Sequence, residues 1–394
     1  MPGINPEVLV WARETAGLSR EKAAKALAIG GTKVSGAEML RRYEEGEKEA
    51  SRPLIVKMAG VYRRPLLVFY LPSPPAKAER GEDFRTLPEE LRIESKGPLD
   101  ALVRDIYVRQ DLVKNVLQDV EEAFPRDYVS SVSMDLEPVV ASEHLGKLIG
   151  FDINEFRRYG KSEEAFAYLR KLIEDMGTFV LLMGNLGSHH TNIPVEAFRG
   201  FALSDKIAPF IVINDQDAPP ARSFTLLHEF AHILIGATGL SGSSTEQKIE
   251  RYCNDIASLL LLPATDLSKQ NWRIGNIDSL IQEISGFAQN INVSSSLVAY
   301  RLLTSGVIDQ ETWTTLSQKF RELWAAQKAA AKEGRDGSSG PSYYVVRRHK
   351  LGGAIVNLVQ RTMREGALTA TKAGRVLGVK PANVYNLVGT YNGA

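Results

Sequence analysis

The sequence predicts an α+β fold that is mainly helical, with one small sheet in the middle of the chain. In this chain of 394 residues, LDALVRDIYVRQDLVKNVLQDVEEAF has apolar residues at three- and four-residue spacing, which is typical of an amphipathic helix, and most segments outside the middle also read as helices. Two short apolar runs, GTFVLLMGN and PFIVIN, are rich in β-branched and aromatic residues and are bounded by Gly, Pro or Asn. They are therefore predicted to be strands, and FRGFALS between them is a third candidate.

Composition narrows the class of protein. Hydrophobic residues make up 44% and charged residues 24% of the chain, and the net charge of +1 favours neither nucleic acid nor a membrane as a partner. The single cysteine, Cys253, excludes a disulfide framework and favours a reducing compartment. The N-terminus lacks the apolar segment of a secretory signal, and no apolar run approaches the roughly 20 residues of a membrane span. We therefore expect a cytoplasmic protein that does not contact a membrane.

Changes in composition divide the chain into five predicted parts. LPSPPAKAERGED is rich in proline and charge, and KEGRDGSSGPS is rich in small polar residues, so both are expected to be linkers. The parts are a helical bundle over residues 1–71, a linker over 72–82, a domain with a helical lead-in and the strands over 83–328, a flexible linker over 329–341 and a small helical tail over 342–394.

Capping residues predict helix boundaries in the first part. Asn5 precedes Pro6 and can cap a first helix, because its side-chain oxygen can accept a hydrogen bond from the first turn. Ser35 and Glu38 have the spacing of a capping box for a later helix, which Gly46 can end.

The stretch FTLLHEFAHILIGATG, residues 224–239, contains two histidines four residues apart. On a helix, His228 and His232 share one face and can bind the same metal ion, while Glu229 lies beside that face. Zinc suits this arrangement, with manganese as the alternative, since three protein ligands leave a position for a water whose pKa falls toward ~7. Glu229 is then expected to accept the proton of this water and pass it to the leaving amine. An accidental pair of histidines on an amphipathic helix is the simpler alternative.

A third ligand is expected on the next predicted helix, which contains IERYCNDIASLLLLP. Glu250 can complete a His-His-Glu zinc site, and Asn254, four residues later on the same face, is expected to orient a ligand. Ala257 extends this face with a small side chain that allows close helix packing. Glu246 is an alternative ligand about one turn earlier, although it lacks an asparagine four residues on.

The segments LSDKIAPFIVIND and RSFTLLHEFAHILIG, followed by ERYCNDIASLLLLPA, resemble the ImmA/IrrE-type metallopeptidase family. That family combines an HExxH helix with E-x-x-A-N-x-F-A and a run ending in Leu-x-Pro; here Cys253 stands for Ala and Ile256 for Phe. The resemblance implies a zincin-like domain whose site has four principal residues, the zinc ligands His228, His232 and Glu250 and the catalytic acid/base Glu229.

The resemblance also implies a cytoplasmic endopeptidase that cleaves a partner protein. That partner would be a helix-turn-helix transcriptional repressor or an antitoxin, and its cleavage would release genes of a stress response or a mobile element. The competing hypothesis is a DNA-binding regulator whose metal site senses or stabilises. Structural zinc sites usually have four protein ligands, whereas this one has three beside an acid, which favours catalysis. The sequence is compatible with a homodimer.

Several residues are candidates for stabilising the transition state of such a reaction. A tetrahedral intermediate requires a donor in addition to the metal, and Arg222, Tyr252, His189 and His190 are near the motif in sequence. A structural role explains each of these residues as well. FRGFALS is a candidate edge strand on which an extended substrate backbone can pair.

The N-terminal segment resembles a helix-turn-helix domain of the phage-repressor (XRE) type. The pattern A-x-x-L followed by L-x-x-Y-E-x-G is carried by five residues, Leu27, Leu40, Tyr43, Glu44 and Gly46. The DNA-contacting residues that this resemblance implies are Lys33, Ser35, Arg41 and Arg42. The insertion AIGGTKVSG lengthens the usual turn, so a protein-interaction or autoinhibitory module is an equal alternative. The tail sequence TATKAGRVLGVKPANVYNLV has a similar helix-turn-helix-like pattern. There we expect two packed helices without contact to DNA.

Overall fold

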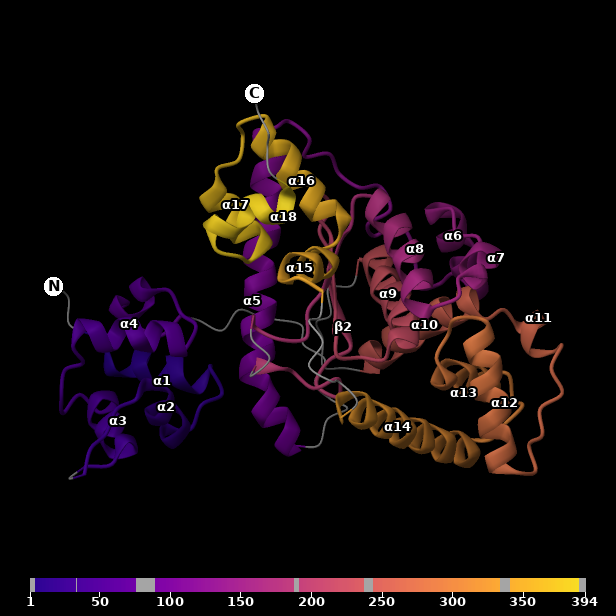
Figure 1. Ribbon diagram of the computed structural model, residues 1–394, viewed down its shortest axis with the longest axis horizontal. Coiled ribbons are helices and arrows are strands. Elements are labelled where there is room, and N and C mark those ends of the chain that lie inside the picture. Colours follow the sequence, from indigo (N-terminus) through magenta and orange to yellow (C-terminus); the bar gives the residue numbers. More distant parts are fainter. Residues whose placement is uncertain are drawn as a thin grey trace. The chain divides into compact units, whose positions relative to one another are not determined.

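The computed structural model describes residues 4–32, 34–75, 89–187, 191–236, 244–333 and 341–389. The chain falls into two compact units, which are Met1–Val108 with Gly184–Phe198 and Arg109–Met183 with Arg199–Ala394. The predicted fold class is confirmed, because helices predominate and a single three-stranded sheet is described (Figure 1). None of the described helices combines the length and apolar character that a membrane span requires. The finer domain boundaries stay predictions.

The first unit begins with a small helical bundle. Its elements are α1 (Pro6–Glu14), α2 (Arg20–Leu27), α3 (Gly36–Glu44), α4 (Arg52–Val61) and the 3-10 helix η1 (Leu66–Tyr70). Asn5 accepts a hydrogen bond from the Glu7 amide at 2.9 Å and Ser35 accepts one from the Glu38 amide at 3.2 Å, as their capping positions predict. Leu27, Leu40 and other apolar side chains of these elements form a common core.

A buried carboxylate connects three helices of this bundle. Glu44, at the end of α3, accepts hydrogen bonds from Arg13 of α1 at 2.5 Å and from Arg20 of α2 at 2.8 Å. The Glu44 side chain is fully buried and that of Arg13 is 8% exposed. Burial of a charge is unfavourable unless it is paired, so the two guanidinium groups explain why this acid is tolerated in the core.

The second unit contains the sheet and most of the helices. The helix α5 (Glu89–Asp119) includes the boundary between the two units. The helices after it are α6 (Pro138–Ile149), α7 (Ile153–Arg158), α8 (Ser162–Asp175), α9 (Pro219–Ile235), α10 (Ser244–Leu261), α11 (Ala264–Leu267), α12 (Ile277–Asn290), α13 (Ser295–Thr304) and α14 (Gln310–Glu333). The last of these continues to Glu333, past the predicted helix end at Lys328, because its AAQKAAAKE sequence consists of strong helix formers.

The sheet consists of the three predicted strands in the order β1-β3-β2. The strands are β1 (Phe179–Leu182), β2 (Gly200–Leu203) and β3 (Phe210–Ile213). The pairing of β1 with β3 is parallel and that of β2 with β3 is antiparallel, with Gly200 opposite Ile213. The two apolar runs that predicted strands are fully buried, whereas β2 is half-buried and lies at the end of the strand order. The helix α9 packs against β2 and β3.

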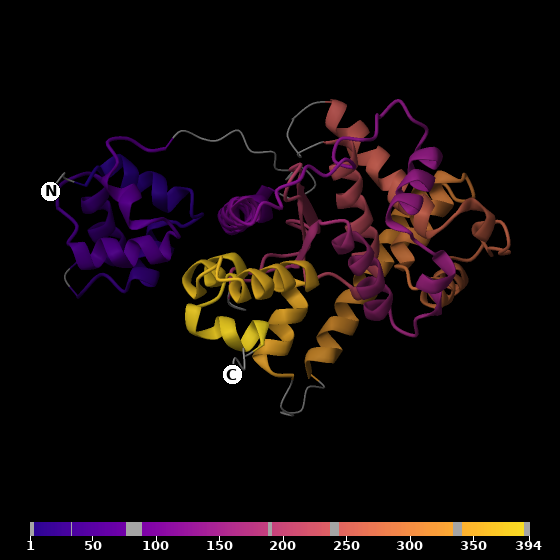
Figure 2. The same cartoon turned by 90° about the horizontal axis from the view of Figure 1, so that it is seen from above.

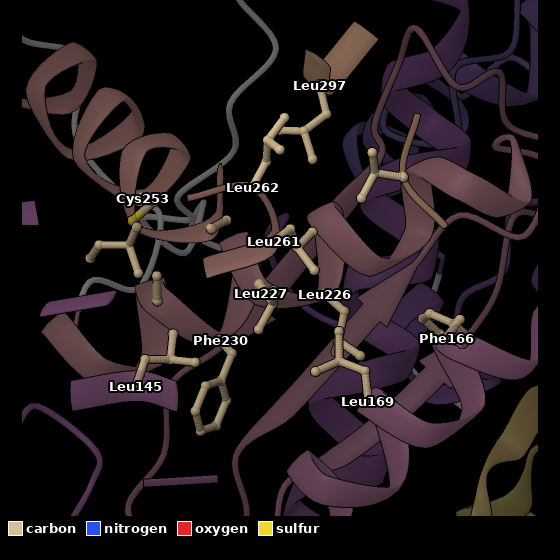
Figure 3. Packing of buried hydrophobic residues seen from close by; sticks show 14 of the residues in the cluster. Leu145, Phe166, Leu169, Leu226, Leu227, Phe230, Cys253, Leu261, Leu262 and Leu297 are labelled. Carbon is tan, nitrogen blue, oxygen red and sulfur yellow. The ribbon is translucent and has the colours of Figure 1, made fainter. Parts of the chain in front are cut away.

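A large apolar core holds α9 against its neighbours. Leu226, Leu227 and Phe230 of α9 are fully buried. Figure 3 shows Leu226 between Leu169 of α8 and Leu261 of α10, and the Phe230 ring beside Leu145 of α6. Because fully burying one such side chain contributes roughly 1.5–3 kcal/mol, this helix is among the most firmly held parts of the unit.

The C-terminal helices pack together and against the sheet-bearing part of the same unit (Figure 2). They are α15 (Tyr343–Leu351), α16 (Gly353–Arg364), α17 (Ala370–Leu377), the 3-10 helix η3 (Pro381–Asn383) and α18 (Val384–Val388). Both α15 and α16 contact β1. Lys350 forms an ion pair with Asp215, whose side chain is 7% exposed, and this pair ties α15 to the loop between β3 and α9.

Candidate metal centre

The helix that carries both histidines is delimited by its own sequence. Pro219 and Pro220 occupy its first turn, where their fixed φ angle suits a helix and no amide donor is needed. Gly236 ends it in the left-handed region, at a φ of 69°, which a residue without a side chain adopts at no steric expense. Between these limits, His228 and His232 lie one turn apart on the side facing α10.

The structure brings His228, His232 and Glu250 together. The Nε2 atoms of the two histidines are 3.1 Å apart. The Glu250 carboxylate lies 3.2 Å from each of them, with Oε2 toward His228 and Oε1 toward His232. One ligand atom from each of the three residues lies within 4.8 Å of the others, and this is a spacing that one metal ion can span.

Close packing of α9 against α10 makes this convergence geometrically feasible. Cys253 and Ala257 on α10 are fully buried, and both are small enough for the two helices to approach each other. The Cys253 thiol also acts on the neighbouring imidazole of His232, whose pKa it raises. Glu250, one turn before Cys253 on α10, thereby lies next to the two histidines of α9.

The pKa values of His232 and Glu250 are shifted in opposite directions by their proximity. Burial lowers the pKa of His232, but its interactions with Cys253 and Glu250 outweigh burial and raise the pKa well above its ordinary value. Burial raises the pKa of Glu250, but hydrogen bonds from both histidines outweigh it and lower the pKa far below the usual range. The ionised carboxylate of Glu250 beside the two imidazoles forms an environment that favours a cation.

Glu229 differs from Glu250 in its surroundings. It is 7% exposed, and burial is the main cause of a pKa above its ordinary value; Glu250 raises the pKa further and the two histidines lower it. Burial thus favours the protonated form of the Glu229 carboxyl group. The role of Glu229 as an acid/base stays a prediction.

The strand β2 approaches Glu229 through a glycine. A Cβ atom at Gly200 would lie 2.8 Å from Oε1 of Glu229 and 2.7 Å from Cγ2 of Thr225. These separations are shorter than normal van der Waals contacts, so only glycine fits between the strand and the helix without displacement. The signal in the sequence is the glycine inside the strand run FRGFALS, and its role could not be inferred without the pairing of β2.

The donor set fits a divalent transition metal. Two imidazoles and one carboxylate are the protein ligands of many catalytic zinc sites, and within the described part of the chain no fourth metal-ligating side chain joins this group. The Nδ1 atoms of His228 and His232 are buried, and neither forms a hydrogen bond with any residue that the structure describes. The Nε2 atoms, which face the shared carboxylate, are therefore the natural ligand atoms.

Other residues singled out from the sequence have different positions. The Asn254 side chain is half-buried on α10 and makes no hydrogen bond to the described residues, so its orienting role stays a prediction. Tyr252 donates to the carbonyl oxygens of Ser133 and Leu136, at 3.3 and 2.9 Å. Arg222 donates to two backbone carbonyls of the loop before α9. The hydroxyl of Tyr252 is therefore already used in structural bonds, whereas the buried Nε of Arg222 has no hydrogen-bond partner among the described residues. His189, His190 and the side chain of Glu246 lie outside the described residues.

The residues proposed for DNA contact in the N-terminal bundle do not form a free cationic surface. Arg41 pairs with Glu38, Glu45 and Glu47, and Arg42 pairs with Glu38. The hydroxyl of Ser35 is occupied as the cap of α3. Lys33 lies outside the described residues.

Similarity to known proteins is concentrated around the metal centre. Residues 185–303 match the family model of the IrrE N-terminal-like domain. The chain is 34% identical over 101 residues to the radiation response metalloprotease IrrE of Deinococcus deserti and 33% identical over 98 residues to that of Deinococcus radiodurans. These alignments cover 23% of this chain and 35% and 30% of the two relatives, so the chain spans about a third of their length.

No solved structure is significantly similar to the chain. The matched segment contains β2, β3, α9 and α10, and with them the two histidines, Glu229 and Glu250. Sequence motif, helix geometry and family model agree on the same segment, and residues 185–303 therefore form a domain of the ImmA/IrrE metallopeptidase family.

Proposed function

We propose that this chain is a zinc-dependent endopeptidase, with His228, His232 and Glu250 as the metal ligands and Glu229 as the catalytic acid/base. The observation that carries the proposal is the convergence of the three ligand groups within 4.8 Å next to a buried carboxyl group of raised pKa. Manganese is an alternative ion, because the same ligands also bind it.

The chain's own residues supply binding and proton transfer. A zinc ion held by the three ligands would polarise the scissile carbonyl and make a water molecule more acidic. Glu229 takes the proton from the attacking water and returns it to the amine that leaves, for which a raised pKa is favourable. Gly200 leaves room for the Glu229 carboxylate beside β2, so that a peptide extended along this end strand would pass the acid/base.

The partner is proposed to be another protein of regulatory function. We infer a helix-turn-helix repressor or an antitoxin as substrate, in a stress response or a mobile element, on the basis of the family resemblance. The relatives are named radiation response metalloproteases, which is consistent with a stress-linked role. A cytoplasmic location is proposed because the single cysteine indicates a reducing compartment. Asn254 is proposed to orient a ligand once the metal is bound.

A Glu229→Gln variant tests this function directly. The change preserves shape and metal ligands but removes the group that transfers the proton, so cleavage should fall by about 1,000-fold or more while metal content is unchanged. The inactive variant, used as bait, should retain an uncleaved regulatory protein that the wild type releases as fragments. Glu311→Gln, an exposed change on α14, serves as the control and should cleave normally.

Two results would refute parts of this proposal separately. Undiminished cleavage by Glu229→Gln would rule out its role as acid/base. Retention of partners that include no transcriptional regulator would overturn the substrate class while leaving the peptidase chemistry intact. A regulatory effect in cells that survives Glu229→Gln would favour the alternative of a DNA-binding regulator with a sensing metal site.

A further inference from the structure

The C-terminal helices form a segment with a strong excess of positive charge. Residues 342–389 contain eight Lys or Arg and one acidic residue, Glu365, which gives this segment a net charge of +7. The whole chain carries only +1, so the remaining residues together carry −6. Glu365 itself pairs with Arg361 at 3.7 Å. The near-neutral total therefore conceals one strongly basic segment.

Several of these cations lie on the surface without a local acidic partner. Arg348, Lys372, Arg375 and Lys380 are exposed, and none of them forms an ion pair with any residue that the structure describes. Lys372 lies in the first turn of α17, which contains no acidic residue, and there the helix dipole disfavours a cation. Its charge is therefore not explained by helix stability.

The same segment has the architecture of a helix-turn-helix. Thr369 caps α17 by accepting from the Lys372 amide, and Gly378 ends it with a φ of 62°. The following turn folds back so closely that a Cβ at Gly374 would lie 2.8 Å from the carbonyl oxygen of Val379. The helices α16, α17 and α18 then pack around a shared set of buried apolar residues (Figure 1).

The N-terminal bundle offers a useful contrast. There, the two arginines of α3 that were proposed to contact DNA are bound by glutamates of the same helix and the turn after it. A phosphate backbone would have to compete with these acids. At the C-terminus the cations of α17 and of the turn after it have no such competitor within the described residues.

We propose that the C-terminal helices bind double-stranded DNA, with Lys372 and Lys380 as phosphate contacts. Helix-turn-helix domains bind the duplex with one helix across the backbone and the next in the groove, and lysines on the outer face of these helices and their turn neutralise phosphates. This proposal differs from the expectation of two packed helices without DNA contact, and it rests on the exposed cations of α17 and of the turn after it. It does not depend on the peptidase activity.

The full-length Lys372→Glu, Lys380→Glu double variant tests the proposal. Fluorescence anisotropy with a short labelled DNA duplex should show wild-type binding that weakens as salt rises from about 50 to 200 mM. The double variant should bind every duplex about tenfold or more weakly, with the salt slope reduced by about two. Lys372→Glu places an acid in the first turn of α17, where the helix dipole favours it, and an unchanged circular dichroism spectrum of the double variant separates loss of binding from unfolding.

A matched control changes the net charge by the same amount at two lysines outside the C-terminal helices. Lys147→Glu with Lys161→Glu, two exposed lysines on α6 and at the start of α8, should leave DNA affinity within about twofold of the wild type. Three outcomes would overturn the proposal: no binding of duplex by the wild type, equal losses in both double variants, or tighter binding of single-stranded RNA or an acidic polypeptide than of the duplex.

Discussion

Arg170 and Glu174 lie one turn apart on α8, form an ion pair at 3.1 Å, and together bind the ends of two other helices. Arg170 donates to the carbonyl oxygens of His349 and Lys350 at the end of α15, and to that of Val180 in β1. Glu174 accepts from the amides of Gly353 and Ala354 at the start of α16. The pair thus satisfies groups at a helix C-terminus and a helix N-terminus that would otherwise be orphaned.

Removal of one partner of this buried pair should be strongly destabilising. Arg170→Met leaves the Glu174 carboxylate, whose side chain is 9% exposed, without its cation, and about 3–5 kcal/mol of unfolding free energy should be lost. Urea unfolding followed by circular dichroism measures the change. The neighbouring Lys171→Met is the control, because Lys171 is 73% exposed and its surface pair should contribute less than about 1 kcal/mol. Equal losses in the two variants would contradict this account of the pair.

The same variant should acquire a characteristic pH dependence. Burial raises the pKa of Glu174 above its ordinary value of 4.5 in the folded protein, and Arg170 opposes this increase. Without Arg170 the pKa rises further, so the folded state holds a proton that the unfolded state releases above pH 4.5. Stability of Arg170→Met should therefore fall as pH rises from about 4.5 to neutrality, more steeply than that of the wild type. A pH-independent difference between the two proteins would contradict this.

The buried carboxylate of the N-terminal bundle provides a second stability test. Glu44→Gln removes the charge that pairs Arg13 with Arg20, so the bundle should lose about 3 kcal/mol of unfolding free energy. Glu45→Gln, one residue later, removes an exposed partner of Arg41 and should change stability by less than about 1 kcal/mol. Thermal unfolding of the two variants compares them, and a larger effect at residue 45 would refute the assignment.

The space that Gly200 leaves beside Glu229, the proposed acid/base, should be necessary for cleavage. Gly200→Ala introduces a methyl group 2.8 Å from the Glu229 carboxylate, which must then move, and cleavage should fall by roughly 100-fold with metal content unchanged. Gly286→Ala on α12 meets no atom within 4 Å and should leave cleavage intact. Steady-state assays on a cleavable substrate make the comparison, and a fully active Gly200→Ala would show that the contact is not limiting.

Substitution of a proposed metal ligand should lower the amount of zinc that the protein retains. Glu250→Ala should weaken zinc affinity by more than about 100-fold, whereas Asn254→Ala should weaken it by about 10-fold if this residue orients a ligand. Metal content after dialysis, measured by atomic spectroscopy, separates the two from the control Glu311→Ala. Full zinc occupancy in Glu250→Ala would remove this residue from the ligand set.

Helical periodicity explains why much of the candidate site could be predicted. Residues four apart share a face, so the sequence places His228 and His232 on the same side of one helix. The strands were also predictable, because GTFVLLMGN and PFIVIN are apolar throughout, as expected of strands buried on both faces. The distance between Glu250 and the two histidines depends on how α10 packs against α9. Helical periodicity does not determine that packing, and the expectation that the three residues meet came from the resemblance to the family motif.

Contacts between distant segments were beyond the reach of local patterns. Glu174 and Gly353 are 179 residues apart, and nothing near either residue indicates the other. Gly200 could be recognised as a glycine within a strand, but its neighbour became apparent only from the antiparallel pairing of β2 with β3. An exposed helix face offers several acids within one turn, and the sequence does not specify which of them pair with the two arginines of α3.

The clamp formed by Arg170 and Glu174 has a consequence for the continuity of the chain. It joins α8 to α15 and α16 by bonds that do not depend on the peptide connection between α14 and α15. A chain cut by a protease between those two helices should therefore keep its C-terminal fragment attached, and the two pieces should travel together in size-exclusion chromatography until a denaturant separates them.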